Sequence, residues 1–175
     1  MLTCVLFPDF AVAIERQHNP ALSSKPLLIA STDRHQRVVA SSSDLRAFGV
    51  KRGDSIRQAL LLCPEAEVIP ANNETYQRVA EETAQSLHVY ANTVELEYQS
   101  THTAFYLATD DPEIATVFPA QIAVAANKFT ARVAAAYAAQ PVYVEPGDEA
   151  AFLESYPVTL LPLNTELRRR LPLLG

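Results

Sequence analysis

Residues 37–64 read RVVASSSDLRAFGVKRGDSIRQALLLCP, and their pattern carries the strongest signals of secondary structure in the chain. An apolar strand is expected over residues 37–40, followed by serines that suit the N-cap of a short helix. Gly49 ends that helix, because glycine adopts the left-handed conformation at a helix C-terminus without steric cost. A second helix is expected over residues 56–63, closed by Pro64. The stretch therefore predicts a strand and two short helices in succession.

Outside this stretch, strands and helices alternate. Apolar and β-branched runs predict strands over residues 2–7, 26–30, 67–69, 93–97, 102–108, 121–125 and 142–144. Apolar residues at helical spacing predict helices over residues 10–17, 73–91, 128–139 and 149–155. The alternation, with one probable hairpin, predicts an α+β (mixed α/β) class.

Composition indicates an ordered protein. Hydrophobic residues make up 49% of the 175 residues and charged residues 19%, the balance of a folded soluble domain. No apolar run approaches the ~20 residues of a membrane span, and the N-terminus lacks a basic leader. A cytoplasmic location is therefore expected. Cys4 and Cys63 lie in aliphatic sequence without a nearby ligand residue, so both are expected to be reduced core residues.

The charge distribution is uneven. The chain carries a net charge of −6, but residues 25–57 hold seven basic and three acidic residues and are locally positive. The basic residues are Lys25, Arg34, Arg37, Arg46, Lys51, Arg52 and Arg57. Such a segment either faces phosphate or forms an ordinary solvated surface, and charge alone leaves both interpretations open.

The four histidines are His18, His35, His88 and His102. None stands near a serine, a cysteine or another ligand at the spacing of a catalytic triad or a metal site. They are expected to be solvent-facing or helix-capping residues, and hydrolase chemistry is not expected.

Three blocks, in this order, resemble the N-terminal region of the Y-family (translesion) DNA polymerases. Residues 10–26, FAVAIERQHNPALSSKP, are similar to a family helix followed by Lys-Pro, and residues 37–64 are similar to the fingers. Residues 121–141, QIAVAANKFTARVAAAYAAQP, resemble the palm strand and the helix that begins Asn-Lys-x-x-Ala-Lys. The resemblance implies a polymerase-like palm sheet with helices on one face and a small fingers subdomain.

The resemblance also implies a division of the chain. Residues 1–9 and 71–145 would form the palm-like subdomain, residues 10–70 the fingers-like subdomain, and residues 146–175 the start of a truncated thumb-like region. Between residues 108 and 121 one short turn would replace a family helix. Whether the end at residue 175 is natural is left open.

The acidic residues expected of the family are missing. Its polymerases bind two magnesium ions through convergent carboxylates. By the resemblance, the acid at the end of the first strand falls at Leu6 and a second at Pro8. The hairpin pair falls within the four residues Ser100, Thr101, His102 and Thr103. The bulky aromatic residue that excludes ribonucleotides falls at Ala11. This pattern resembles the catalytically defective ImuB-like branch, for which no metal or other cofactor is expected.

A displaced metal site is the alternative. Glu95 and Glu97 share one face of a strand by its two-residue period, and Asp9 follows the first strand. If these three acids converge, the chain is an active magnesium-dependent translesion polymerase with relocated carboxylates. Otherwise they are ordinary surface acids.

Two basic positions match residues that contact the incoming triphosphate in the family. Arg46 falls on the fingers arginine and Lys128 on the palm lysine. Arg37, Lys51 and Arg52 are further candidates for contact with DNA. The competing interpretation of Arg46 and Lys128 is a pair of surface salt bridges.

The resemblance implies a function in DNA repair and SOS-type damage tolerance. The leading hypothesis is a non-catalytic accessory of translesion synthesis that binds DNA, weakly for this chain, or a polymerase partner. An error-prone polymerase, the sliding clamp or a RecA-like protein would bind through regions outside this chain. The remaining alternative is a protein-interaction module without DNA contact.

Overall fold

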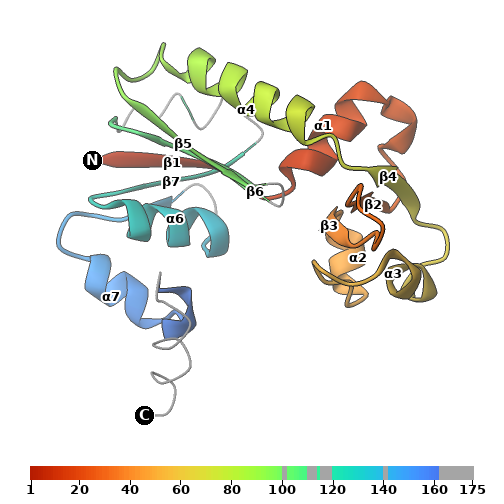
Figure 1. Cartoon of the computed structure of the whole chain (residues 1–175). Coiled ribbons are helices and arrows are strands. Elements are labelled where there is room, and N and C mark those ends of the chain that lie inside the picture. The colour runs from red at the N-terminus through yellow and green to blue at the C-terminus, as the bar shows by residue number, and fades with distance from the viewer. Residues whose placement is uncertain (100–101, 110–113, 115–119, 140–141, 162–175) are drawn as a thin grey trace.

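Two β-sheets joined by two helices form the part of the chain that the computed structural model describes: residues 1–99, 102–109, 114, 120–139 and 142–161. The larger sheet has the order β5 (Val94–Gln99), β6 (His102–Leu107), β1 (Leu2–Phe7), β7 (Gln121–Ala125) and β8 (Val142–Tyr143). The smaller sheet has the order β3 (Val38–Ser41), β2 (Leu27–Ala30) and β4 (Glu67–Pro70). Figure 1 shows the two sheets side by side, with helices running between them.

The central strand β1 is antiparallel to both of its neighbours. Leu6 lies opposite Ala104 of β6 and Gln121 of β7, while β7 and β8 are parallel. Side chains alternate along β1, so Leu6 and Val5 point to opposite faces of the sheet. Both side chains are buried, which means that each face of this sheet is covered.

Helices cover both faces of the larger sheet. The cluster around Leu6 includes Ala131 and Ala135 of α6 (Lys128–Tyr137), whereas the cluster around Val5 includes Leu87 of α4 (Asn73–Leu87). The prediction of a mixed α/β class is confirmed. The expectation that helices lie on one face is corrected, because a strand whose two faces are both apolar needs a covering layer on each side.

The smaller sheet carries the two short helices predicted from residues 37–64. They are α2 (Ser43–Ala47) and α3 (Ile56–Leu62). Gly49 has φ +92° just after α2, as expected of a left-handed stop. Ser55 and Gln58 form a reciprocal capping box at the start of α3.

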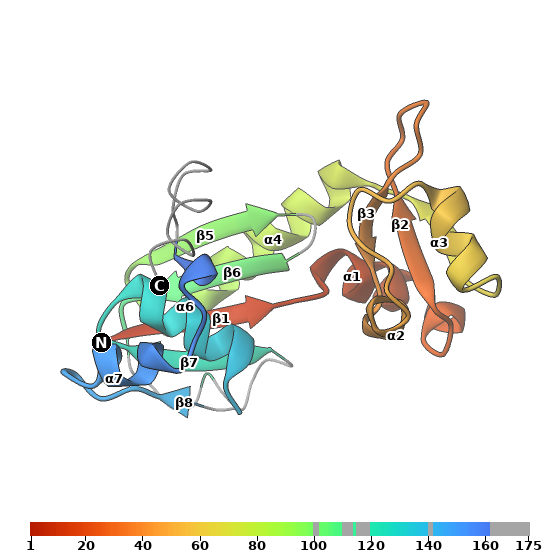
Figure 2. The same ribbon diagram turned by 90° about the horizontal axis from the view of Figure 1, so that it is seen from below.

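The helices α1 (Phe10–His18) and α4 join the two sheets (Figures 1 and 2). A shared core of α1, α4 and the smaller sheet includes Ile14, Ile29 and Tyr76, with Leu96 of the larger sheet packed against it. The hydroxyl of Tyr76 is 2.5 Å from Glu15 Oε1. Burial, and then this hydrogen bond, raises the pKa of Tyr76, so the phenol stays protonated and donates the bond.

The remaining described elements are α7 (Glu149–Glu154), which the sequence predicted, and two 3-10 helices. The 3-10 helices, Pro20–Leu22 and Val158–Leu160, were not predicted. The segment in which a turn was expected to replace a family helix falls mostly outside the described residues. The division into palm-like, fingers-like and thumb-like parts stays a prediction. Among the helices described, none is long and apolar enough to cross a bilayer.

Replacing Tyr76 with Phe should lower the free energy of unfolding by about 1–3 kcal/mol, because Glu15 loses its buried hydrogen-bond donor. Urea denaturation measures the change. Tyr143→Phe, at a half-exposed tyrosine of β8, serves as the control and should change stability by less than about 0.5 kcal/mol. Equal effects of the two substitutions would contradict the role assigned to Tyr76.

Candidate functional site

An open cleft of about 860 Å³ lies between the two sheets. The end of β1 and helix α6 line one wall, and β3 with the segment after α2 lines the other. Four cationic side chains line it: Arg46, Lys51 and Arg52 from the smaller-sheet side and Arg132 from α6. Of the lining residues that the structure describes, Asp9 alone carries a carboxylate. The balance of charge in the cleft therefore favours anions.

The strand end that would hold a metal acid is apolar. Leu6 lines the cleft but is only 2% exposed, because it packs in the cluster of Ala104 and Ala131. Pro8 lines the same cleft. Neither side chain offers an anionic oxygen, so these residues do not fit a magnesium ion. The hairpin positions Ser100 and Thr101 lie outside the described residues.

An ion pair crosses the cleft between Asp9 and Arg46. The Nη1 and Nη2 atoms of Arg46 donate to the two carboxylate oxygens of Asp9 at 2.6 and 3.1 Å. Arg46 Nη1 also donates to the carbonyl oxygen of Ser41 at 2.6 Å. The guanidinium is therefore held by the end of β3 and by the residue that precedes α1. The two-point geometry aligns Arg46 more firmly than a single contact would.

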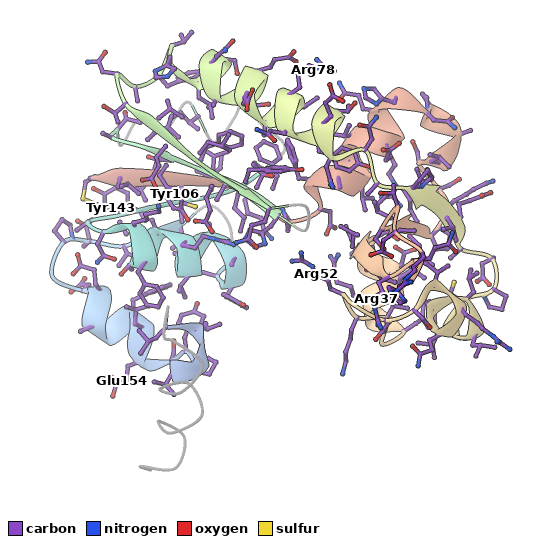
Figure 3. The ribbon with its side chains drawn as sticks, viewed as in Figure 1. Arg37, Arg52, Arg78, Tyr106, Tyr143 and Glu154 are labelled. Atoms are coloured by element: carbon purple, nitrogen blue, oxygen red, sulfur yellow. The ribbon has the colours of Figure 1, made fainter. Side chains whose placement is uncertain are left out.

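Lys128 has a carboxylate partner as well. It forms an ion pair with Glu95, and its ammonium group lies 4.3 Å from the ring centre of Tyr106. Tyr106 in turn donates a hydrogen bond to Glu97 at 2.8 Å (Figure 3 labels Tyr106). Burial raises the pKa of Tyr106, so its hydroxyl remains a donor. Glu95 and Glu97 thus share one face of β5, as their spacing predicted.

His102 lies inside the site, which corrects the expectation of a solvent-facing or capping residue. Burial first, and then the charge of Arg132, holds the pKa of His102 below its usual range. The imidazole is therefore neutral at pH 7, and its contact with Glu97 at 3.8 Å is not an ion pair. His18 and His88 do stand at the ends of α1 and α4, as expected.

The other basic candidates separate into two groups. Lys51 and Arg52 are exposed and line the cleft. Arg37 is not among the lining residues; it donates to the carbonyl oxygen of Gly53 at 2.8 Å and so ties β3 to the turn that follows α2. Arg132 was missed by the sequence reasoning. The available signal was its place at the lysine position of the Asn-Lys-x-x-Ala-Lys pattern, one helical turn after Lys128.

The three acids of the displaced metal site have separate contacts. Asp9 contacts Arg46, Glu95 contacts Lys128, and Glu97 contacts Tyr106. Within the described ranges no group of three acidic, histidine or cysteine side chains is placed to hold a metal ion.

The two sheets and the cleft between them have the fold of the N-terminal palm-and-fingers region found in the Y-family of DNA polymerases. The chain belongs to the impB/mucB/samB family, whose model matches residues 5–136.

Sequence relatives lie in the same family. The chain is 26% identical over 170 residues to "DNA polymerase IV" of Xanthomonas campestris pv. campestris (strain 8004), covering 87% of this chain and 47% of the relative. It is 28% identical over 142 residues to "DNA polymerase IV" of Bacillus velezensis, covering 72% of this chain and 34% of the relative. The chain thus spans at most about half the length of these relatives.

Solved structures share the fold. DinB from Sulfolobus solfataricus matches with a TM-score of 0.78 and 22% identity, covering 100% of this chain and 57% of that one. The post-insertion binary complex of Dbh DNA polymerase matches with a TM-score of 0.81, also at 22% identity, with coverage of 100% and 57%.

Replacing Asp9 with Asn should strengthen binding of an oligonucleotide by about fivefold, since a unit charge at ~4 Å in water is worth ~1 kcal/mol. Because Arg46 and Asp9 are 46% and 28% exposed, the loss of stability should stay below about 1 kcal/mol. Fluorescence anisotropy measures the affinity. The control is Glu82→Gln, which neutralises one acid of the exposed Arg78–Glu82 pair on α4. A gain no larger than that of the control would contradict the assignment.

Stability should fall on acidification through His102. The folded-state pKa of His102 is lowered, so the unfolded chain binds a proton first, and the free energy of unfolding decreases as the pH falls below the ordinary value of 6.5. Arg132 and Arg52 add to the effect, while Glu97 opposes it. Urea denaturation between pH 5 and 8 should show a shallower decline for His102→Gln; an identical decline would exclude this source.

Proposed function

We propose that the chain is the non-catalytic palm-and-fingers part of a DNA-repair accessory in translesion synthesis, close to the ImuB-like branch of the Y-family. The observation that carries the proposal is Leu6, a buried aliphatic residue at the strand end that faces the cleft. Polymerases of this family place an acid there to hold catalytic magnesium. An aliphatic side chain provides no ligand for a divalent cation.

The surroundings of Leu6 support this proposal. Its neighbours in the core cluster are Cys4, Ala104 and Tyr106, so the strand end is part of an apolar layer. Burial raises the pKa of Cys4 to about 12, which keeps the thiol protonated and unsuited to bind a metal at neutral pH. Tyr106 is also held in its neutral form. The nearest buried side chains on this face therefore provide no anion in place of the missing acid.

A role in contact with DNA is supported by the charge of the cleft. Four cationic side chains and one carboxylate line it, in a chain whose net charge is −6. Concentrated positive charge attracts phosphate even on an acidic protein. Because the chain spans about half the length of its relatives, this region alone should bind DNA weakly.

Contacts with an error-prone polymerase, the sliding clamp or a RecA-like protein belong to the same proposal and would use regions outside this chain. SOS-type regulation and a cytoplasmic location are parts of the hypothesis that rest on the sequence. A protein-interaction module without DNA contact is the competing function, and it predicts an affinity for DNA that is negligible at any salt concentration.

Primer extension by the full-length protein tests the loss of catalysis. We expect no templated incorporation with magnesium or manganese, because Leu6 and Pro8 cannot hold either ion. A relative with the complete set of acids provides the positive control. Templated incorporation that disappears on Asp9→Asn or Glu97→Gln would overturn the proposal in favour of an active polymerase with relocated acids.

A further inference from the structure

We propose that the cleft binds a single-stranded nucleic-acid segment without a metal ion, with Arg52 and Arg132 holding one backbone phosphate from opposite walls and Tyr137 stacking on a base. This inference rests on the proposed role in contact with DNA, and it names the form of nucleic acid and the residues that recognise it.

Both cations at the positions that contact the triphosphate in the family already form ion pairs with carboxylates. Arg46 is paired with Asp9, and Lys128 is paired with Glu95. A triphosphate carries several negative charges that magnesium normally shares, and neither the metal acids nor free cations stand at these positions. A free triphosphate would therefore lack the contacts that these two positions make in the family.

The uncompensated positive charge lies elsewhere in the cleft. Among the described residues, the ion pairs of the site involve Arg46 and Lys128, and not Arg52 or Arg132. Arg52 follows α2 on the smaller-sheet side, and Arg132 lies in the middle of α6. Figure 3 shows Arg52 on the side of the smaller sheet that faces the larger one.

Arg52 and Arg132 both lie close enough to His102 to affect its charge. Both line the cleft, and the charges of both depress the pKa of His102, which lines it too. A phosphodiester between these walls would exchange their mutual repulsion for charge-assisted hydrogen bonds, which guanidinium groups form with two phosphate oxygens at once. This arrangement fits one backbone phosphate and requires no divalent ion.

An aromatic surface continues from the arginines. A second cavity of about 620 Å³ shares His102, Arg132, Ala136 and Tyr137 with the cleft. Tyr137 ends α6, lines both cavities and is 60% exposed, so its ring is accessible to a ligand. Its ring contacts Tyr156 at 6.2 Å between centroids, which steadies its orientation.

Basic groups beside an exposed aromatic ring select unpaired bases. In a duplex the base faces are buried in the stack, so an aromatic side chain inside a cleft finds a stacking partner only on a single strand or a flipped base. The combination of two arginines and Tyr137 therefore favours single-stranded over double-stranded nucleic acid.

Fluorescence anisotropy with a labelled oligothymidylate of twelve nucleotides tests the inference. The titrations contain EDTA and cover a series of salt concentrations. Because both arginines hold the same phosphate, the double variant Arg52→Ala/Arg132→Ala should reduce the slope of log affinity against log salt by about 0.7, the single-strand value for one phosphate contact, and each single variant should weaken binding with a smaller change of slope. Tyr137→Ala should weaken binding by at least about fivefold with little change of slope, because stacking carries no charge. Thermal melting of each variant checks that it folds.

Matched controls come from residues of the same type outside the cleft. Arg78→Ala, at an exposed ion pair of α4, and Tyr143→Ala, at a half-exposed tyrosine of β8, should leave both affinity and slope unchanged. Inorganic triphosphate and a blunt duplex of equal length serve as competitors, and both should displace the labelled strand less effectively than unlabelled oligothymidylate does.

Three outcomes would overturn the inference: binding that requires magnesium, equal competition by triphosphate or duplex, or a slope that stays the same in the double variant Arg52→Ala/Arg132→Ala. Salt-dependent binding that none of the three substitutions alters would contradict the inference but would remain consistent with the proposed role in contact with DNA. Templated primer extension would instead remove the proposed function, whatever the cleft variants do.

Discussion

The packing of α1 against α4 is the constraint on which the site depends. The two walls of the cleft belong to different sheets, and these two helices carry the core that joins them. Tyr76 and Glu15 form a partly buried hydrogen bond within that junction. Because α1 and α4 each connect a strand of one sheet to a strand of the other, their packing links the two walls of the cleft. The cleft therefore depends on packing residues, such as Tyr76 and Glu15, that do not line it.

The electrostatics of the site have the opposite arrangement to that of a metal-dependent polymerase. Such an enzyme gathers carboxylates around cations and leaves its basic side chains for the substrate. Here the carboxylates of Asp9 and Glu95 form ion pairs with Arg46 and Lys128, and the side chain at the strand end, Leu6, is aliphatic. The fold of the family is kept, while the two cations at its triphosphate-contact positions are each paired with a carboxylate. The proposed function follows from this redistribution.

Much of the fold could be predicted because its signals are local. The capping box of Ser55 and the glycine stop at Gly49 are set by neighbouring residues, and both α2 and α3 appear where they were expected. The partners of Asp9 and Arg46 could not be predicted, since 37 residues separate them and only the tertiary packing brings them together. His102 was misjudged for the same reason: its burial comes from distant elements. The placement of α4 and α6 on opposite faces likewise depends on the path of the chain between strands.

The burial of Leu6 affects which substitutions are accessible to this chain during evolution. A leucine in this apolar layer adds favourable packing, whereas an aspartate without its metal would place an uncompensated charge among Cys4, Ala104 and Ala131. A single reversion would therefore lower stability before it restored any metal site, and the hairpin acids would still be lacking. Under the proposed function, the loss of catalysis would behave as an evolutionary ratchet: the fold gains from the aliphatic residue at once, and a return to catalysis needs several coordinated substitutions.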